Sequence, residues 1–298
     1  MKKVLVIAGP TASGKSALAV HLAKRYGGEV ISGDSIQIFR GMDIGSGKVT
    51  EEEKEGIPHH LIDILDPKDS FSAADFQRMA REWIEKIDVP IIAGGTGLYL
   101  KACLYDYSFS KEEDIPLDER YERMDNHALH EELKRIDPES AEKIHENNRR
   151  RVLRAIAISE RTGMTKSEQE KNQLHEPLYD LFVAGCTMKR EQLYERINRR
   201  VESMFEAGLE QEVRGLLEKG VCFDDPSMRG IGYQEFRPYF EGKASLEEVR
   251  LAIQKHSRNY AKRQYTWFNH QMPVHWYDVS TDGWMKQAET DTDLWRSL

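Results

Sequence analysis

Short apolar runs alternate with amphipathic stretches as far as about residue 100 of the chain. Three apolar runs have the length of ordinary strands: residues 3–8, 29–34 and 89–95. Two stretches between them place apolar side chains at helical spacing: residues 15–26 and 72–87. Gly27 and Gly28 follow the first stretch, where a helix C-terminus favours glycine. This alternation predicts a parallel sheet that is covered by helices on both faces.

The pattern changes between about residue 107 and residue 180, where the sequence becomes charged, helical and poor in strands. The sheet pattern returns with an apolar run at residues 181–188. We therefore predict an inserted all-helical domain at 107–180, within a core that is built from residues 1–106 and 181–298.

The last third of the chain repeats the helical and strand signals of the core. An apolar stripe from Leu193 to Phe205 predicts a helix that ends near Gly220. Ser245 and Glu248 have the spacing of a capping box, so we expect them to open a helix that runs towards Trp267. Residues 273–279 have the pattern of a last strand.

Composition and charge narrow the classes of protein that fit this pattern. The net charge of −8 argues against a protein that coats nucleic acid indiscriminately, because that mode needs a large positive excess. The three cysteines form no CxxC pair, so they predict neither a disulfide framework nor a zinc site, and we expect a cytoplasmic protein. No apolar run reaches the length of about 18 residues that a membrane span needs, and the apolar run at the start is too short for a signal peptide. Three stretches are rich in basic residues: 147–154, 189–200 and 255–263. Each could be a solvated helix face, or the three could form a binding surface.

Residues 9–16, "GPTASGKS", match the phosphate-binding pattern G-x-x-x-x-G-K-[ST]. The motif follows a predicted strand and opens a predicted helix, so its backbone amides and the helix dipole face a bound anion. We expect Lys15 to neutralise phosphate oxygens. The Ser16 hydroxyl is a hard oxygen ligand of the kind that Mg²⁺ prefers, so Mg²⁺ is the predicted cofactor. The predicted anion-binding set is Gly9, Pro10, Thr11, Ala12, Ser13, Gly14, Lys15 and Ser16.

An acid and an amide follow the second predicted strand. Asp34 lies at the carboxyl end of this strand, where open α/β sheets place ligand groups, so it is a candidate to hold or deprotonate an acceptor. The same carboxylate could instead cap the turn that begins at Ser35. The amide of Gln37 could read a base edge, or it could only satisfy its own loop.

Residues 94–102, "GGTGLYLKA", again place glycines between a strand end and a helix. Thr96 would present its hydroxyl to a second anion or to a reacting centre, or it would only cap the helix. Arg196 and Arg200 are four residues apart and share a helix face from which they could reach into a cleft. The alternative is a surface ion pair with a neighbouring acid, Glu195 or Glu202.

Six blocks in order resemble the tRNA isopentenyltransferase family, the bacterial tRNA dimethylallyltransferases: "GPTASGKS", "SGDSIQIFRGMDIGSGK", "GGTGLYLKA", "RRRVLRAIAI", "MRGIGYQEF" and "YAKRQYTWF". The resemblance covers about residues 3–279. It implies a P-loop NTPase-like α/β fold. It also implies transfer of a dimethylallyl group from dimethylallyl diphosphate to the N6 amine of the adenosine immediately 3′ of the anticodon. The phosphate loop would then hold the diphosphate that leaves.

The resemblance also assigns roles to residues. It makes Asp34 the base that takes the amine proton, and it adds Thr96 and Arg200 as catalytic residues that face the leaving group. It implies that the insertion and the C-terminal helices grip the anticodon arm of tRNA, that the target base leaves its stack, and that the protein is a monomer. The implied tRNA contacts are Asp34, Ser35, Ile36, Gln37, Thr96, Arg120, Arg151, Arg154, Arg229, Gly230, Ile231, Gly232, Tyr233, Gln234, Arg263 and Gln264.

Three other functions share part of this evidence. A P-loop kinase of a nucleotide or small metabolite would use Gly9–Ser16 and Asp34, but it would not need "RRRVLRAIAI" or "YAKRQYTWF". An adenylate isopentenyltransferase acting on free nucleotide would not need the insertion or the long C-terminal helix. A nucleotide-dependent RNA-binding switch without transfer chemistry would leave Asp34 and Thr96 without a role.

Overall fold

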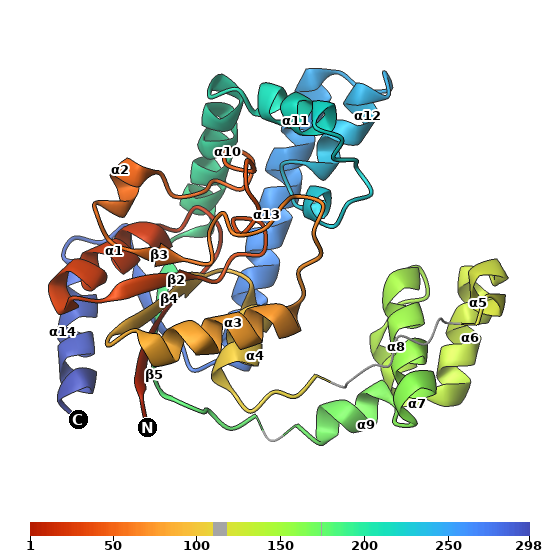
Figure 1. Cartoon of the computed structure of the whole chain (residues 1–298), viewed down its shortest axis with the longest axis horizontal. Coiled ribbons are helices and arrows are strands. Elements are labelled where there is room, and N and C mark those ends of the chain that lie inside the picture. Colours follow the sequence, from red (N-terminus) through yellow and green to blue (C-terminus); the bar gives the residue numbers. More distant parts are fainter. Residues whose placement is uncertain (110–117, 174) are drawn as a thin grey trace. The chain divides into compact units, whose positions relative to one another are not determined.

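Six parallel strands form the centre of the computed structural model, which describes residues 1–109, 118–173 and 175–298. Their order across the sheet is β3-β2-β4-β1-β5-β6, and every neighbouring pair is parallel (Figure 1). The strands are β1 (Lys3–Ala8), β2 (Glu29–Ser32), β3 (His59–His60), β4 (Pro90–Gly94), β5 (Asp180–Thr187) and β6 (His275–Asp278). This sheet confirms the predicted parallel α/β architecture. The two-residue strand β3 has no apolar run of its own and was not predicted.

The central strand β1 is buried on both faces because it lies between β4 and β5 and carries an unbroken apolar run. Leu5 and Ile7 point to one face, where they pack with α1 (Lys15–Tyr26) and α14 (Trp284–Ser297). Val4 and Val6 alternate to the other face and are also fully buried. The remaining helices of the core are α2 (Glu51–Lys54), α3 (Ala73–Lys86), α4 (Gly97–Leu104), α10 (Arg190–Glu206), α11 (Leu209–Glu218), α12 (Arg237–Phe240) and α13 (Leu246–Gln271), with short 3₁₀ turns at Ser227–Arg229 and Gln234–Phe236.

One predicted helix is wrong in its extent. The apolar stripe that was expected to continue to about Gly220 is divided between α10 and α11. Gly208 separates them with a φ of +97°, a left-handed conformation that a β-carbon disfavours, so the helix turns there. The predicted capping box is confirmed, because the Ser245 side chain accepts from the Glu248 backbone and Glu248 reaches back to the Ser245 backbone.

Residues Tyr105–Glu176 form a compact unit separate from the core, which comprises Met1–Leu104 and Pro177–Leu298. The boundaries lie a few residues before the predicted 106/107 and 180/181, because residues 177–180 already belong to the approach to β5: the Leu178 N–H donates to the Leu104 carbonyl at 2.9 Å. The described part of the unit is helical, as predicted, and residues 110–117 and 174 of the predicted insertion lie outside it. Its helices are α5 (Arg120–Arg123), α6 (Asn126–Ile136), α7 (Pro138–Lys143), α8 (Arg149–Thr162) and α9 (Lys166–Lys171).

Other apolar clusters lie outside the one that contains Leu5 and Ile7. In the core, α10, α11 and α13 pack with the loop after β2, and this cluster includes Ile38, Val201, Val213 and Tyr233. In the helical unit, Tyr121, Leu129, Leu133 and Val152 form a separate small core.

Across the described residues, none of the helices has both the length and the apolar character that a membrane crossing requires.

Candidate active site

The loop between β1 and α1 has the shape that an anion cradle needs. Gly9 has a φ of +140°, and a β-carbon at this position would lie 2.7 Å from the Cys186 carbonyl oxygen, so only glycine fits. Lys15 Nζ donates to the Pro10 carbonyl at 2.6 Å and therefore lies over the loop. Burial lowers the pKa of Lys15 to about 8. Ser13 Oγ is buried and has no hydrogen-bond partner among the described residues, so it offers a hydroxyl to an anion.

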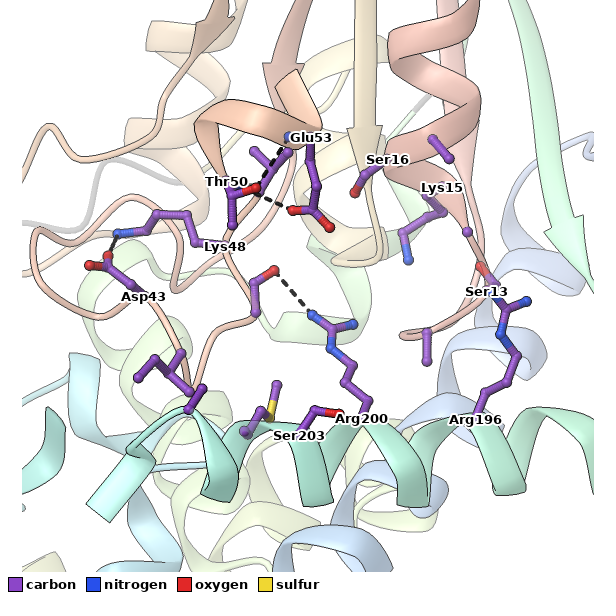
Figure 2. A pocket seen from close by; sticks show the side chains of 18 residues that line it. Ser13, Lys15, Ser16, Asp43, Lys48, Thr50, Glu53, Arg196, Arg200 and Ser203 are labelled. Carbon is purple, nitrogen blue, oxygen red and sulfur yellow. Dashed lines mark hydrogen bonds and ion pairs between the residues drawn. The ribbon is translucent and has the colours of Figure 1, made fainter. Parts of the chain in front are cut away.

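A pocket of about 610 Å³ opens beside this loop. Figure 2 shows Lys15 and Ser16 on one side of it, Arg196 and Arg200 rising from α10, and Glu53 of α2 opposite them. Lys15, Arg196 and Arg200 thus line one cavity whose wall includes a phosphate loop, together with Lys48, which pairs with Asp43 and Asp63. This arrangement favours a ligand that carries several negative charges.

Arg200 is half-buried between two loops. Its Nη1 donates to Thr11 Oγ1 of the phosphate loop at 3.4 Å, and its Nη2 donates to the Gly47 carbonyl at 3.1 Å. Burial lowers the pKa of Arg200, but a guanidinium stays charged at neutral pH. Among the described residues neither Arg196 nor Arg200 pairs with the acids of the surface alternative: Glu195 pairs with Arg199, and Glu202 pairs with Arg250. The cleft interpretation of Arg200 therefore agrees with the structure.

Asp34 lies just beyond the end of β2, and its Oδ1 accepts from the backbone N–H groups of Ile36 at 2.8 Å and Gln37 at 3.2 Å. The carboxylate therefore caps the turn that begins at Ser35, which was the alternative interpretation of Asp34. Within the described part of the chain, however, Asp34 Oδ2 accepts no hydrogen bond, so one oxygen stays available for a proton. The Gln37 amide donates to the Gly47 carbonyl at 3.2 Å, and its oxygen accepts from Ser32 Oγ.

Gln264 of α13 joins the phosphate loop to the turn that carries Thr96. Its Oε1 accepts from the Thr11 N–H at 2.9 Å, and its Nε2 donates to the Gly95 carbonyl at 2.9 Å. Tyr260 lies one turn earlier on α13, and burial raises the pKa of its hydroxyl. Gln264 thus holds the phosphate loop and the turn that precedes Thr96 in one site.

The comparisons with known proteins agree with this geometry. The sequence model of the IPP transferase family matches residues 37–271. A tRNA dimethylallyltransferase of Bacillus cytotoxicus is 52% identical over 95% of this chain and 92% of its own. The chain belongs to the tRNA dimethylallyltransferase family. It is therefore a transferase of tRNA modification.

Solved structures of this family give the same result. The crystal structure of the tRNA delta(2)-isopentenylpyrophosphate transferase of Staphylococcus epidermidis is 44% identical, covers 100% of both chains and has a TM-score of 0.74. A eukaryotic dimethylallyltransferase acting on tRNA, known from crystallographic snapshots, is 29% identical. The match covers 98% of this chain and 78% of that chain, with a TM-score of 0.83. The family fold therefore extends over the whole chain.

The family's two expected tRNA-contacting stretches, residues 34–37 and 229–234, lie against each other. A β-carbon on Gly230 would come within 2.9 Å of the Ile36 side chain, and one on Gly232 would come within 2.8 Å of the Gly45 carbonyl. Ser35, Ile36 and Ile231 are partly exposed, and Arg229 and Gln234 are exposed. Two of the expected RNA contacts are different: the side chains of Tyr233 and Gln264 are buried and bonded within the protein. We therefore assign these two side chains to the support of the site rather than to RNA contact.

The exposed face of α13 has a hollow of about 700 Å³, lined by Arg263 and Trp267 together with Asn259, Lys262, Thr266, His270 and Gln271. Arg263 lies over the ring of Tyr260, with 5.6 Å between the guanidinium carbon and the ring centroid. Of the other aromatic residues in the block "YAKRQYTWF", Phe268 is fully buried and the Tyr265 hydroxyl bonds to Thr187. Trp267 therefore remains the aromatic residue of this hollow.

In the helical unit, α8 carries the arginines of the block "RRRVLRAIAI", of which one is bonded within the unit and others are exposed. Arg149 donates to the backbone carbonyls of Met124, Tyr121 and Glu122, so it is a structural residue. Arg151 and Arg154 are exposed, and Arg151 makes no side-chain hydrogen bond or ion pair within the described residues. Arg120 bonds to the Tyr121 hydroxyl and pairs with Glu160, so its charge is partly neutralised by an acid.

The sequence patterns gave no signal for Glu212 and Glu53. Glu212 lies on α11 and bonds to the loop after β2, and Glu53 lines the pocket from α2. Glutamates in exposed helices are common, so residue type and spacing alone do not separate these two from the other acids of the chain.

Proposed function

We propose that this chain transfers the dimethylallyl group of dimethylallyl diphosphate to the exocyclic N6 amine of the adenosine immediately 3′ of the anticodon in tRNA. The observation that carries the proposal is the Gln264 bridge, which joins Thr11 of the phosphate loop to Gly95, next to Thr96. The groups suited to a leaving diphosphate and those suited to an acceptor base therefore form one site.

In the proposed reaction, the bond between the allylic carbon and the diphosphate oxygen breaks, and its electron pair leaves with the diphosphate. A new bond forms between the allylic carbon and the amine nitrogen, and the amine proton passes to Asp34. The adenine amine is a weak nucleophile because its lone pair is delocalised into the ring, so a base beside it helps the transfer. Lys15, Arg196 and Arg200 line the same cavity and would stabilise the charge that develops on the diphosphate.

The residues present also fit a magnesium ion. Ser16 is exposed at the start of α1, beside the pocket, where its hydroxyl supplies one hard oxygen. The described residues contain no group of three His, Cys, Asp or Glu side chains suited to a metal, so most other ligands would be diphosphate oxygens and waters. When bound there, Mg²⁺ would supply further positive charge to the leaving group.

An amine inside a stacked anticodon loop is out of reach of this site, so the target base must leave its stack at a cost of a few kcal/mol. The hollow on α13 with Arg263 and Trp267 suits single-stranded RNA, because unstacked bases are bound by aromatic rings and guanidinium planes. We propose that this face and the exposed Arg151 and Arg154 of α8 bind the anticodon arm.

The test separates transfer from phosphorylation. The purified protein is incubated with unmodified tRNA and either labelled dimethylallyl diphosphate or γ-labelled ATP, and the tRNA nucleosides are separated by mass. We expect N6-dimethylallyl adenosine with the first donor and no labelled phosphate on tRNA with the second. Efficient phosphate transfer from ATP to any acceptor would move the assignment to the kinase class. Transfer of the dimethylallyl group to free adenylate but not to tRNA would indicate an adenylate isopentenyltransferase.

A further inference from the structure

The Glu212 carboxylate of α11 accepts an unusual number of backbone hydrogen bonds from one loop. Its Oε2 accepts from the N–H groups of Asp43 at 2.9 Å and Ile44 at 2.7 Å. Its Oε1 accepts from the Gly45 N–H at 3.0 Å and from the Tyr233 hydroxyl at 2.8 Å. A single side chain thus satisfies three successive amides that neither a helix nor a strand would satisfy.

Tyr233 completes this arrangement. Its ring is fully buried, and its oxygen accepts from the Ser46 N–H at 3.2 Å while its O–H donates to Glu212. Burial and the adjacent carboxylate raise the pKa of Tyr233, so the phenol remains a neutral donor. Gly45 permits this contact, because a β-carbon there would lie 2.5 Å from the ring. Glu212 and Tyr233 together bind the backbone of four consecutive residues.

The loop that they hold ends at Gly47, whose carbonyl faces the site. This one oxygen accepts from Arg200 Nη2 at 3.1 Å and from Gln37 Nε2 at 3.2 Å. Gly47 has a φ of +58°, and a β-carbon there would overlap the Arg200 guanidinium at 1.6 Å. The position of the Gly47 carbonyl therefore sets where the guanidinium of Arg200 lies.

We propose that Glu212 is a positioning residue for Arg200, acting through the segment Asp43–Gly47. This inference rests on the proposed function, because the orientation of Arg200 matters for catalysis only if Arg200 faces the leaving diphosphate. Glu212 does not line the pocket itself, but it binds the backbone of Asp43 and Ile44 in the pocket wall, and the same loop ends at the carbonyl that orients Arg200.

The test is Glu212→Gln. A glutamine side chain has one acceptor oxygen and a donor NH2 group, whereas both oxygens of Glu212 accept backbone N–H groups. At least one backbone N–H would therefore face a nitrogen, and the loop would lose its fixed position. We expect kcat for transfer to fall by about 10- to 100-fold, in the range typical of a misplaced catalytic group, while the Kd for tRNA changes less than about twofold. Glu210→Gln is the matched control, because Glu210 lies on the same helix, pairs with Arg214 and touches none of residues 43–47. We expect this control to transfer at the wild-type rate.

A double-mutant cycle distinguishes positioning from a general loss of structure. If Glu212 acts through Arg200, then adding Glu212→Gln to Arg200→Ala should lower kcat by less than about threefold further, because the group to be positioned is already gone. Full additivity of the two losses would overturn the proposal. Tyr233→Phe, which removes only one hydroxyl, should lower kcat in the same direction by a smaller factor, and it serves as the second variant if Glu212→Gln does not fold.

Hydrogen exchange separates this inference from the proposed function. The amides of residues 43–46 should exchange faster in Glu212→Gln than in the wild type, whatever reaction the protein catalyses. If the wild-type protein transfers no dimethylallyl group, the proposed function fails. If the wild type transfers the group and Glu212→Gln does so at the same rate, the proposed function stands and the positioning role is refuted.

Discussion

The depressed pKa of Lys15 makes donor binding sensitive to pH in the alkaline range. With a pKa of about 8, Lys15 is about 90% charged at pH 7 and about 10% charged at pH 9. A diphosphate binds the charged form of Lys15 more tightly than the neutral form. Its affinity for the protein is therefore highest below this pKa and falls as the pH rises through it. Between pH 7 and pH 9 the Kd should therefore rise by about tenfold, or about 1.4 kcal/mol. The bound anion raises the pKa of Lys15 in the complex. The Kd stops rising once the pH exceeds this higher pKa.

The assay is isothermal titration of the protein with dimethylallyl diphosphate and Mg²⁺ at several pH values across this range. Lys15→Arg is the matched control, because a guanidinium stays charged throughout and the Kd should then change little with pH. The reasoning would be refuted by a Kd that does not change in the wild type. It would equally be refuted by the same rise in Lys15→Arg, which would place the titrating group elsewhere.

Four other predictions follow from the site. Asp34→Asn retains an oxygen for the amides of Ile36 and Gln37 but cannot take a proton, so single-turnover transfer should slow by about 10²–10⁴ with tRNA binding kept. Arg200→Ala should lower kcat and kcat/KM together by about 10²–10³. Arg151→Ala should weaken tRNA binding in filter assays and reduce its salt slope by about 1. Gln264→Leu leaves the buried Gly95 carbonyl and the part-buried Thr11 N–H unpaired, so both Tm and transfer rate should fall.

Each of these predictions has an outcome that contradicts it. Wild-type transfer by Asp34→Asn would remove Asp34 as the base. Loss of tRNA affinity with an unchanged single-turnover rate in Arg200→Ala would place Arg200 in the RNA contact, and Arg199→Ala, which breaks only a surface pair with Glu195, is its control. An unchanged salt slope in Arg151→Ala would exclude a phosphate contact. A normal Tm in Gln264→Leu would show that the bridge is not formed in solution.

The sequence was informative where function depends on local spacing. The phosphate loop, the acid after β2 and the threonine before α4 are each defined by neighbours within a few residues, and the structure places them at the carboxyl ends of adjacent strands. The same holds for the capping box at Ser245, where a short motif fixes the start of a long helix.

Contacts between distant segments could not be predicted from the sequence. Glu212 bonds to amides about 170 residues earlier in the chain, and Gln264 bonds to the phosphate loop across most of the sequence. Neither side chain differs by type or spacing from exposed residues of the same helix. Tyr233 and Gln264 lie in motifs that predicted RNA contact, yet their side chains are buried, because a motif identifies a segment and not the direction of each side chain.

The hydrogen bond between the Asp106 N–H and the Glu176 carbonyl, at 2.8 Å, has a consequence for how the protein folds during synthesis. Strand β1 is made early, but its partner β5 follows only after the 72 residues of Tyr105–Glu176. Closing a flexible loop of this length costs about 4 kcal/mol in chain entropy from the length-dependent term alone. If the helical unit folds first, its own two ends already meet, so it delivers β5 to the open edge of β1. A folded insertion would then leave the edge of β1 exposed for less time than a flexible segment of the same length.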